Sequence, residues 1–186
     1  YEEFFNFIWD DDADFRHDGK FTKEKLIDRQ RHFYAMVTGV DLAVGHVLDV
    51  LEENGELDDT LIIFGSDHGD ACGDHGAIGK DTRYFDGVMH VPLVMHWPKA
   101  FGTKGRRIDG LMEMVDIMPT LSELCGIPRH ENFQGKSYAK VLLGEEDFIP
   151  RSDVYAIHSP GDVMLRNESY KFLLYWRNGE RREILF

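Results

Sequence analysis

The feature that most constrains the fold is a short apolar run that leads directly into a polar, glycine-rich loop. The run at residues 60–64 (Thr-Leu-Ile-Ile-Phe) is typical of a strand buried on both faces in a parallel sheet. The loop at residues 65–80 is dense in aspartate, histidine and glycine. Ligands of an open α/β sheet collect beyond the carboxyl ends of its strands. The sequence therefore predicts an α/β fold with a functional loop at 65–80.

A long amphipathic helix is predicted before this strand. Apolar residues recur at helical spacing from Thr22 onward, and Asn54-Gly55 is a stop signal. We expect its apolar face to pack on the sheet. The residues expected on that face include Phe33, Val37, Val44 and Leu48.

Two further elements continue the α/β pattern. Residues 91–95 (Val-Pro-Leu-Val-Met) have the character of a second strand, and residues 116–124 form a short predicted helix. Asp116 is the expected N-cap of this helix, and Gly126 is its C-terminal stop.

The last stretch has a different pattern, with short β-rich segments and a hairpin signal at Asn178-Gly179. We therefore predict two parts, residues 1–149 with an α/β core and residues 150–186 with a small antiparallel β subdomain. The strands expected in the second part are 154–157, 163–166, 170–176 and 181–186.

Four side chains of the loop are candidates for chemistry. Asp67 and His68 offer a carboxylate oxygen and an imidazole nitrogen to one divalent cation, although such a pair in a turn is commonly structural. Lys80 could neutralise an anionic group or be a solvated surface residue. His75 could donate a proton or only hydrogen-bond within the loop. Their position in one loop favours a common functional role.

The overall charge restricts the partners. The chain of 186 residues carries 21 Lys and Arg against 34 Asp and Glu, for a net charge of -13. This balance repels nucleic acid and anionic lipid, so an anionic substrate needs a local positive site.

The apolar runs are shorter than the roughly 20 residues of a membrane helix, so no membrane span is expected. The oligomeric state is left open.

The loop and its surroundings resemble the C-terminal half of the sulfatase family in the alkaline phosphatase superfamily. The matching residues are 60–69 (Thr-Leu-Ile-Ile-Phe-Gly-Ser-Asp-His-Gly), 73–76 (Gly-Asp-His-Gly), Lys80, Tyr84 and 90–94 (His-Val-Pro-Leu-Val). The pattern is most similar to iduronate sulfatase, choline sulfatase and phosphonate monoester hydrolase. Further matches are Tyr34-Ala35, Asp41, Gly45, Val115-Asp116-Ile117, Pro119-Thr120, Gly126-Ile127 and Gly135-Lys136-Ser137.

The resemblance implies an alkaline phosphatase-like sheet flanked by helices and a role for each loop candidate. Asp67 and His68 would be two ligands of one divalent cation, with Ca²⁺ expected and Mn²⁺ or Mg²⁺ as alternatives. Lys80 would contact the sulfate oxygens. His75 would also take part in catalysis, but its match to the family pattern is weaker. The implied substrate is a small-molecule or carbohydrate sulfate ester, and the implied location is periplasmic or secreted.

The family's nucleophile is a formylglycine made from Cys or Ser in a Cys/Ser-x-Pro/Ala-x-Arg box near the N-terminus. Cys125 does not fit that box, because its proline is three places on and it follows the metal loop. We therefore expect a fragment with half of the metal and sulfate site, inactive in isolation. The alternatives are a phosphonate monoester or phosphodiester hydrolase of the same superfamily, and a non-catalytic metal-binding remnant.

Overall fold

The computed structural model describes all residues except 1–22, 75–76, 81–83, 160 and 178. The chain divides into two compact units. The first contains residues 1–57, 68–91 and 176–182, and the second contains 58–67, 92–175 and 183–186. The predicted site residue His75 lies outside the described residues. The predicted division at residue 150 stays a prediction.

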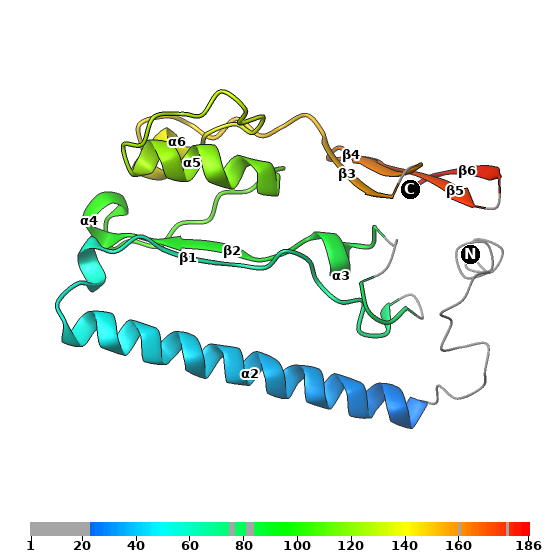
Figure 1. Ribbon diagram of the computed structural model, residues 1–186, viewed down its shortest axis with the longest axis horizontal. Helices are drawn as coiled ribbons and strands as arrows, with labels where there is room; N and C mark the ends of the chain where they lie inside the picture. The colour runs from blue at the N-terminus through cyan, green and yellow to red at the C-terminus, as the bar shows by residue number, and fades with distance from the viewer. Residues whose placement is uncertain (1–22, 75–76, 81–83, 160, 178) are drawn as a thin grey trace. The chain divides into compact units, whose positions relative to one another are not determined.

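The predicted long helix is present as α2 (Lys23–Glu53, 31 residues), shown in blue to cyan in Figure 1. It ends at the expected signal, where Gly55 takes a φ of +70°. Phe33, Val44 and Leu48 are half-buried, but α2 has no fully buried residue and Val37 is 52% exposed. The expectation of a packed apolar face is therefore wrong for Val37, since an apolar stripe is buried only where a partner surface covers it.

By length and composition alone, α2 is also apolar enough to cross a membrane. The sequence expectation of no membrane span rested on unbroken apolar runs, whereas α2 reaches this threshold with acidic residues interspersed. Soluble core helices and signal sequences pass the same test, so the finding does not assign a span. The expectation stays a prediction.

The two predicted strands form one ribbon. β1 (Ile62–Gly65) pairs with β2 (Leu93–His96), with Ile63 opposite Met95, and the two run side by side in Figure 1. The pairing is antiparallel, so the predicted parallel direction is wrong. The predicted burial of this strand on both faces is also wrong, because Ile63 is 36% exposed. A continuous apolar run indicates a strand but does not encode its direction, which depends on how the 27-residue connection returns to the ribbon.

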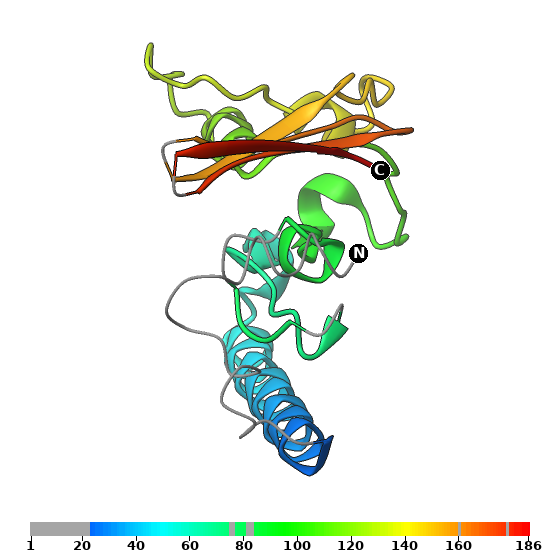
Figure 2. The same ribbon diagram turned by 90° about the vertical axis from the view of Figure 1, so that its right-hand side faces the viewer.

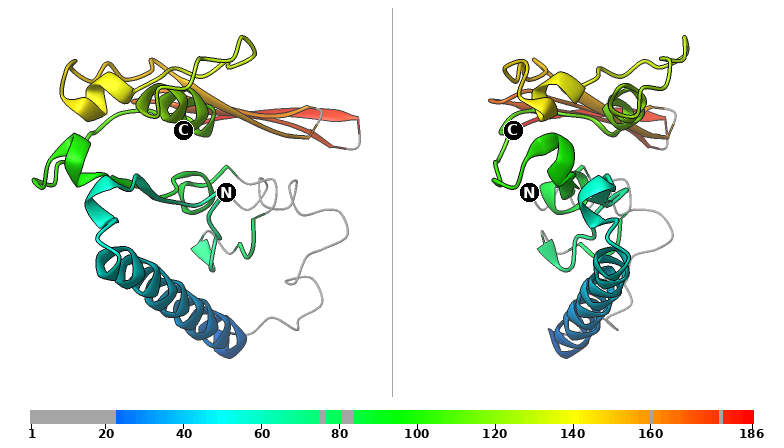
Figure 3. Two further views of the ribbon diagram at one scale, coloured as in Figure 1. Left: turned by 60° about the vertical axis from the view of Figure 1, so that its left-hand side comes forward. Right: turned by 90° about the vertical axis from the view of Figure 1, so that its left-hand side faces the viewer.

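Short helices follow the ribbon: α4 (Pro98–Phe101), the 3-10 helix η3 (Met114–Asp116), α5 (Ile117–Leu124) and α6 (Ala139–Leu143). The helix predicted at 116–124 is confirmed, and Gly126 ends it with a φ of +65°. α5 and α6 contact each other and lie together in Figure 3.

The four predicted C-terminal strands form one antiparallel sheet, visible in Figure 2 as orange to red ribbons. The strands are β3 (Val154–Ser159), β4 (Asp162–Arg166), β5 (Lys171–Arg177) and β6 (Glu180–Leu185), in spatial order β3-β4-β5-β6. Met164 on β4 lies opposite Leu173 on β5, and both side chains are almost fully buried. The predicted pairing of the last two strands is confirmed, because β5 and β6 are neighbours and the amides of Lys171 and Phe186 donate to each other's carbonyls. Asn178 of the predicted turn lies outside the described residues.

Candidate functional site

The predicted metal ligands follow the end of β1. β1 ends at Gly65, and Asp67 and His68 come two and three residues later, as the strand-then-loop order predicts. Asp67 is exposed and His68 is half-buried. Convergence of the two side chains on one point stays a prediction.

The structure brings His68 together with Lys80. Nζ of Lys80 lies 3.0 Å from Nε2 of His68, and Nδ1 of the same ring lies 2.9 Å from the carbonyl oxygen of Gly69. A carbonyl oxygen can only accept, so Nδ1 carries the ring proton and Nε2 presents its lone pair to the ammonium. A histidine held in this way by a backbone carbonyl has its other nitrogen oriented as a metal ligand would be.

Asp70 holds the loop that carries Lys80. Its Oδ1 accepts the amide of Cys72 at 2.8 Å and the amide of Gly79 at 3.2 Å, and its Oδ2 lies 3.4 Å from Nη2 of Arg29 on α2. The bond to Cys72 is an Asx turn, in which an aspartate caps the amide two residues ahead. The carboxylate therefore connects the start of the loop to Gly79, the residue directly before Lys80.

Electrostatics support an ionised Asp70. Partial burial raises the pKa of this carboxyl, but the amides of Cys72 and Gly79 and the charge of Arg29 outweigh burial, so the pKa lies below its ordinary value. The same carboxylate affects the neighbouring thiol: burial, together with the hydrogen bond to Asp70 and its negative charge, raises the pKa of Cys72 to about 11. Cys72 is therefore a protonated, unreactive thiol at neutral pH.

Backbone contacts complete the loop. The amide of Ala71 donates to Gly79 at 2.9 Å, and the amide of Gly69 donates to Val88 at 2.8 Å. Gly69 has no room for a side chain, because a Cβ there would lie 1.9 Å from the carbonyl oxygen of Gly87. From α2, Nε2 of Gln30 donates to the carbonyl of Cys72 at 2.8 Å. Ala71 and Ala77 of the loop form a small apolar core with Phe85 and Val88, and Met89 packs against this core.

The donor set fits part of a metal site. Asp67 and His68 offer an oxygen and a nitrogen ligand in consecutive positions, a combination that suits a divalent cation. Among the described residues, however, no group of three or more His, Cys, Asp or Glu side chains could hold a metal ion.

A second polar cluster centres on Asp116, which is fully buried. Its carboxylate accepts Nε of Arg151 at 3.0 Å, a second bond from Nη2 of Arg151, and the amides of Glu113 at 3.0 Å and Lys136 at 2.7 Å. Asp116 occupies the N-cap position of α5 as predicted, but its carboxylate makes no capping bond to that helix, because other donors take up its oxygens. Gly135 packs closely here, since a Cβ would lie 2.0 Å from the carbonyl oxygen of Val115.

Arg151 links this cluster to the C-terminal sheet. Its Nη1 lies 3.2 Å from Oε2 of Glu113, whose Oε1 accepts the amide of Tyr155 on β3 at 2.9 Å. Burial raises the pKa of Asp116, but the hydrogen bonds from Arg151 and from the two amides outweigh burial and hold that pKa below its ordinary value of about 3.8. The hydrogen bond to Asp116 in turn raises the pKa of Arg151. This cluster joins the η3–α5 turn to the start of the sheet.

Sequence reasoning missed both Asp70 and Arg151. Asp70 had a usable signal, since an aspartate in a glycine-rich loop commonly forms an Asx turn. Arg151 had none, because its partner Asp116 lies 35 residues away.

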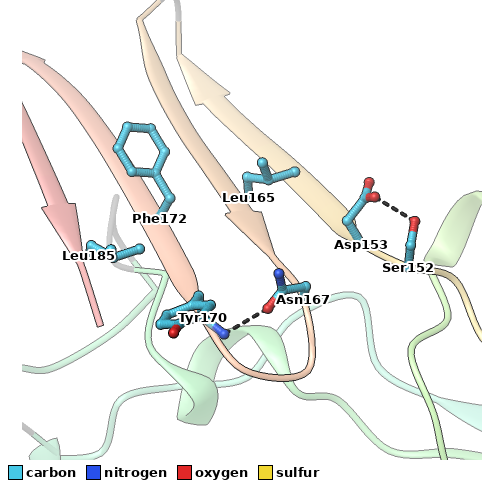
Figure 4. A pocket seen from close by; sticks show the side chains of 7 residues that line it. All are labelled: Ser152, Asp153, Leu165, Asn167, Tyr170, Phe172 and Leu185. Atoms are coloured by element: carbon cyan, nitrogen blue, oxygen red, sulfur yellow. Dashed lines mark hydrogen bonds between the residues drawn. The ribbon is translucent and has the colours of Figure 1, made fainter.

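A separate hollow of about 530 Å³ lies on the C-terminal sheet (Figure 4). Its polar groups bond locally: Oγ of Ser152 donates to Asp153 at 2.6 Å, and Oδ1 of Asn167 accepts the amide of Tyr170 at 2.7 Å. The remaining lining is largely apolar, so it adds no catalytic group to the loop site. The apolar lining residues are Leu165, Phe172 and Leu185, with the ring of Tyr170.

The fold and loop define a class of protein. The chain superposes on a phosphonate monoester hydrolase of Agrobacterium radiobacter with a TM-score of 0.76 and 29% identity, covering 89% of this chain and 36% of that one. This is an alkaline phosphatase-like fold. The family model "Sulfatase" matches residues 1–127, and the model "N-sulphoglucosamine sulphohydrolase, C-terminal" matches residues 73–185. The chain therefore belongs to the sulfatase family.

Named relatives agree with this assignment. Arylsulfatase K of Gallus gallus is 30% identical over 168 residues, a match that covers 84% of this chain and 31% of the relative. A solved structure in complex with its substrate D-glucosamine-2-N,6-O-disulfate is 27% identical, with a TM-score of 0.65 and coverage of 81% of this chain and 32% of that one. The chain thus spans about a third of the length of the relatives it matches.

Proposed function

We propose that this chain is part of a metal-dependent sulfuric ester hydrolase and carries half of its metal and sulfate site. The observation that carries the proposal is the 3.0 Å contact between Nζ of Lys80 and Nε2 of His68. The contact supports the proposal, because the side chain expected to contact the sulfate lies next to a side chain expected to bind the metal. Membership in the sulfatase family supports the proposed hydrolase function.

In this proposal, Asp67 and His68 hold one divalent cation. When bound, that cation supplies positive charge at the ester's oxygens. The bond from Nδ1 to the carbonyl of Gly69 leaves Nε2 as the ligand atom of His68. Ca²⁺ is the expected ion by family and a carboxylate ligand also suits Mn²⁺, so the two ions are compared directly in the test below.

Lys80 supplies the second positive charge. A sulfate ester builds negative charge on its oxygens as the bond to the leaving group breaks, and a fixed ammonium stabilises that charge. The chain's net charge of -13 makes a local cation necessary for capturing an anion at all. The formylglycine nucleophile of the family would have to come from elsewhere in the complete protein, because Cys125 does not fit its sequence box.

The proposed substrate is a sulfate ester on a small molecule or a carbohydrate. One solved relative carries a disulfated glucosamine as its substrate, which supports the carbohydrate class. We also propose the periplasmic or secreted location that the resemblance implies, which fractionation of the source cells would test.

The alternative function is hydrolysis of a phosphonate monoester or a phosphodiester. The likeness to a phosphonate monoester hydrolase favours it, because the same cation and lysine would serve either anion. The two esters carry the same single negative charge but differ in the central atom, sulfur or phosphorus, so parallel assays with the same aryl leaving group separate the two functions.

The test uses the complete protein, including the sequence upstream of this chain. Hydrolysis of an aryl sulfate and an aryl phosphonate ester is measured with chelator and with added Ca²⁺ or Mn²⁺. Faster turnover of the sulfate, abolished by chelator, is the expected result. Faster turnover of the phosphonate supports the alternative, and cation binding without turnover of either ester would identify a non-catalytic metal-binding protein.

A further inference from the structure

We propose that Asp70 is a positioning residue that sets where the ammonium of Lys80 lies. The inference rests on the proposed function of Lys80, and it assigns a role to a side chain that touches neither the substrate nor the cation. Asp70 is two residues beyond His68 and ten before Lys80 in the sequence, yet its hydrogen bonds reach the residue adjacent to Lys80.

The first step is the bond to the amide of Gly79. This amide is covalently next to Lys80, so the carboxylate fixes the backbone from which the lysine side chain begins. The carbonyl of Gly79 is held as well, because it accepts the amide of Ala71, the residue after Asp70. Both polar backbone groups of Gly79 are thus tied to Asp70 or its neighbour.

The second step concerns the other carboxylate oxygen of Asp70, Oδ2. Oδ2 lies 3.4 Å from Nη2 of Arg29, and Gln30, one residue on, holds the carbonyl of Cys72. Two neighbouring side chains of α2 therefore contact the loop residues that Asp70 connects. These contacts attach the loop to a regular element, the 31-residue helix α2.

The third step is the length of the lysine side chain. A flexible four-carbon stem can place its ammonium in many positions, so the backbone must be fixed for Nζ to stay near Nε2 of His68. His68 is itself fixed through Gly69, whose amide donates to Val88. Without the carboxylate of Asp70, the lysine side of this pair loses the bond at the Gly79 amide and keeps only the bond from Ala71 to the Gly79 carbonyl, whereas the histidine side keeps its contacts. Misplacement of a catalytic group by about 1 Å lowers turnover by up to roughly a hundredfold.

The experiment combines two Asp70 variants with Lys80→Ala in the complete enzyme. Asp70→Ala removes the acceptor, and we expect kcat to fall at least about tenfold while the affinity for the divalent cation is unchanged. Asp70→Asn keeps an acceptor oxygen for both amides and should recover most of kcat. In the Lys80→Ala background, Asp70→Ala should have little further effect, because a positioning residue acts only through the group it positions.

Hydrogen exchange of the Gly79 amide provides a readout that does not depend on activity. Exchange should accelerate in Asp70→Ala and stay close to wild type in Asp70→Asn. The matched control is Asp109→Asn, which also removes a carboxylate paired with an arginine, Arg107, but at an exposed surface site. It should change neither kcat nor the exchange of Gly79.

The outcomes separate this proposal from the proposed function. If the wild-type enzyme hydrolyses neither ester, the function fails, while faster exchange of Gly79 in Asp70→Ala still supports the anchoring role. Unchanged exchange overturns the positioning role whatever the activity, and so does an equal loss of kcat with and without Lys80. If Asp70→Ala does not fold, Asp70→Glu decides, because it keeps the charge but moves the oxygens: wild-type kcat and exchange in that variant overturn the proposal.

Discussion

Nζ of Lys80 lies 3.0 Å from Nε2 of His68, although the two residues are 12 positions apart. One of these side chains was predicted to hold a cation and the other to contact an anion. Nε2 has one lone pair, so a cation bound by His68 would displace the ammonium from this contact, and both positive charges would then lie beside His68 to face one anionic substrate. The predictions about the loop follow from this pair.

Removing the Lys80 ammonium should mainly impair turnover. Lys80→Ala in the complete enzyme should lower kcat by about a hundredfold or more, because the ammonium stabilises charge that develops in the transition state. Folding should change little, since Lys80 is exposed. The assay is hydrolysis of an aryl sulfate, with Lys99→Ala as control because Lys99 pairs with Asp59 at an exposed site elsewhere. Normal turnover of the Lys80 variant would show that Lys80 is a solvated surface residue with no role in catalysis.

Changing Asp67 should give a different kinetic signature. Asp67→Asn removes a charged oxygen ligand, so the affinity for the divalent cation should fall, and added Ca²⁺ or Mn²⁺ should recover part of the activity. Added cation should not rescue Lys80→Ala, because no ion replaces a tethered ammonium. Titration of activity against cation concentration measures both effects. An Asp67 variant with wild-type cation dependence would exclude Asp67 as a ligand.

Breaking the Asp116–Arg151 pair should destabilise the fold. Arg151→Ala leaves a fully buried carboxylate without its cation, a change that typically costs about 3 kcal/mol or more in the free energy of unfolding. Urea denaturation followed by circular dichroism measures the loss. The control is Arg107→Ala, which breaks an exposed pair with Asp109 and should cost at most about 1 kcal/mol. Equal losses for the two variants would contradict a structural role for the buried pair.

The same carboxylate predicts the direction of an acid effect. The folded-state pKa of Asp116 lies below its ordinary value of about 3.8, so its contribution to stability is present above that value and is lost as the pH falls through the folded-state pKa. The urea midpoint of the wild type should therefore fall more steeply below about pH 4 than that of Asp116→Asn. Parallel pH profiles of the two proteins would exclude this contribution.

The two cysteines should differ in reactivity. Burial and the nearby Asp70 raise the pKa of Cys72 to about 11, so at pH 8 its thiolate is roughly a hundredfold scarcer than that of a thiol with the ordinary pKa of 9.0. Cys125 is exposed. Mass spectrometry after brief treatment with iodoacetamide should find the label on Cys125 long before Cys72. Labelling of Cys72 as fast in the native as in the denatured protein would contradict the raised pKa.

Local patterns in the sequence were sufficient to predict most of the helices and strands. The helical spacing and the Asn54-Gly55 stop predicted α2, and the turn signal at residues 178–179 predicted the β5–β6 hairpin. The strand-then-loop order also placed Asp67 and His68 after β1. Such features depend on residues within one or two turns of each other, so the sequence contains the information directly.

Only the tertiary structure decided how these elements pair. The apolar run of β1 indicated a strand, but its antiparallel partner was set by the path of the connection to β2. The bonds from Asp70 to Gly79 and from Asp116 to Arg151 span 9 and 35 residues. Hydrogen bonds over such separations depend on how the backbone returns in space, and the same side chains in another fold would meet different partners. The residue types of the candidate site could therefore be read from the sequence, whereas the contacts that align them came from the packing.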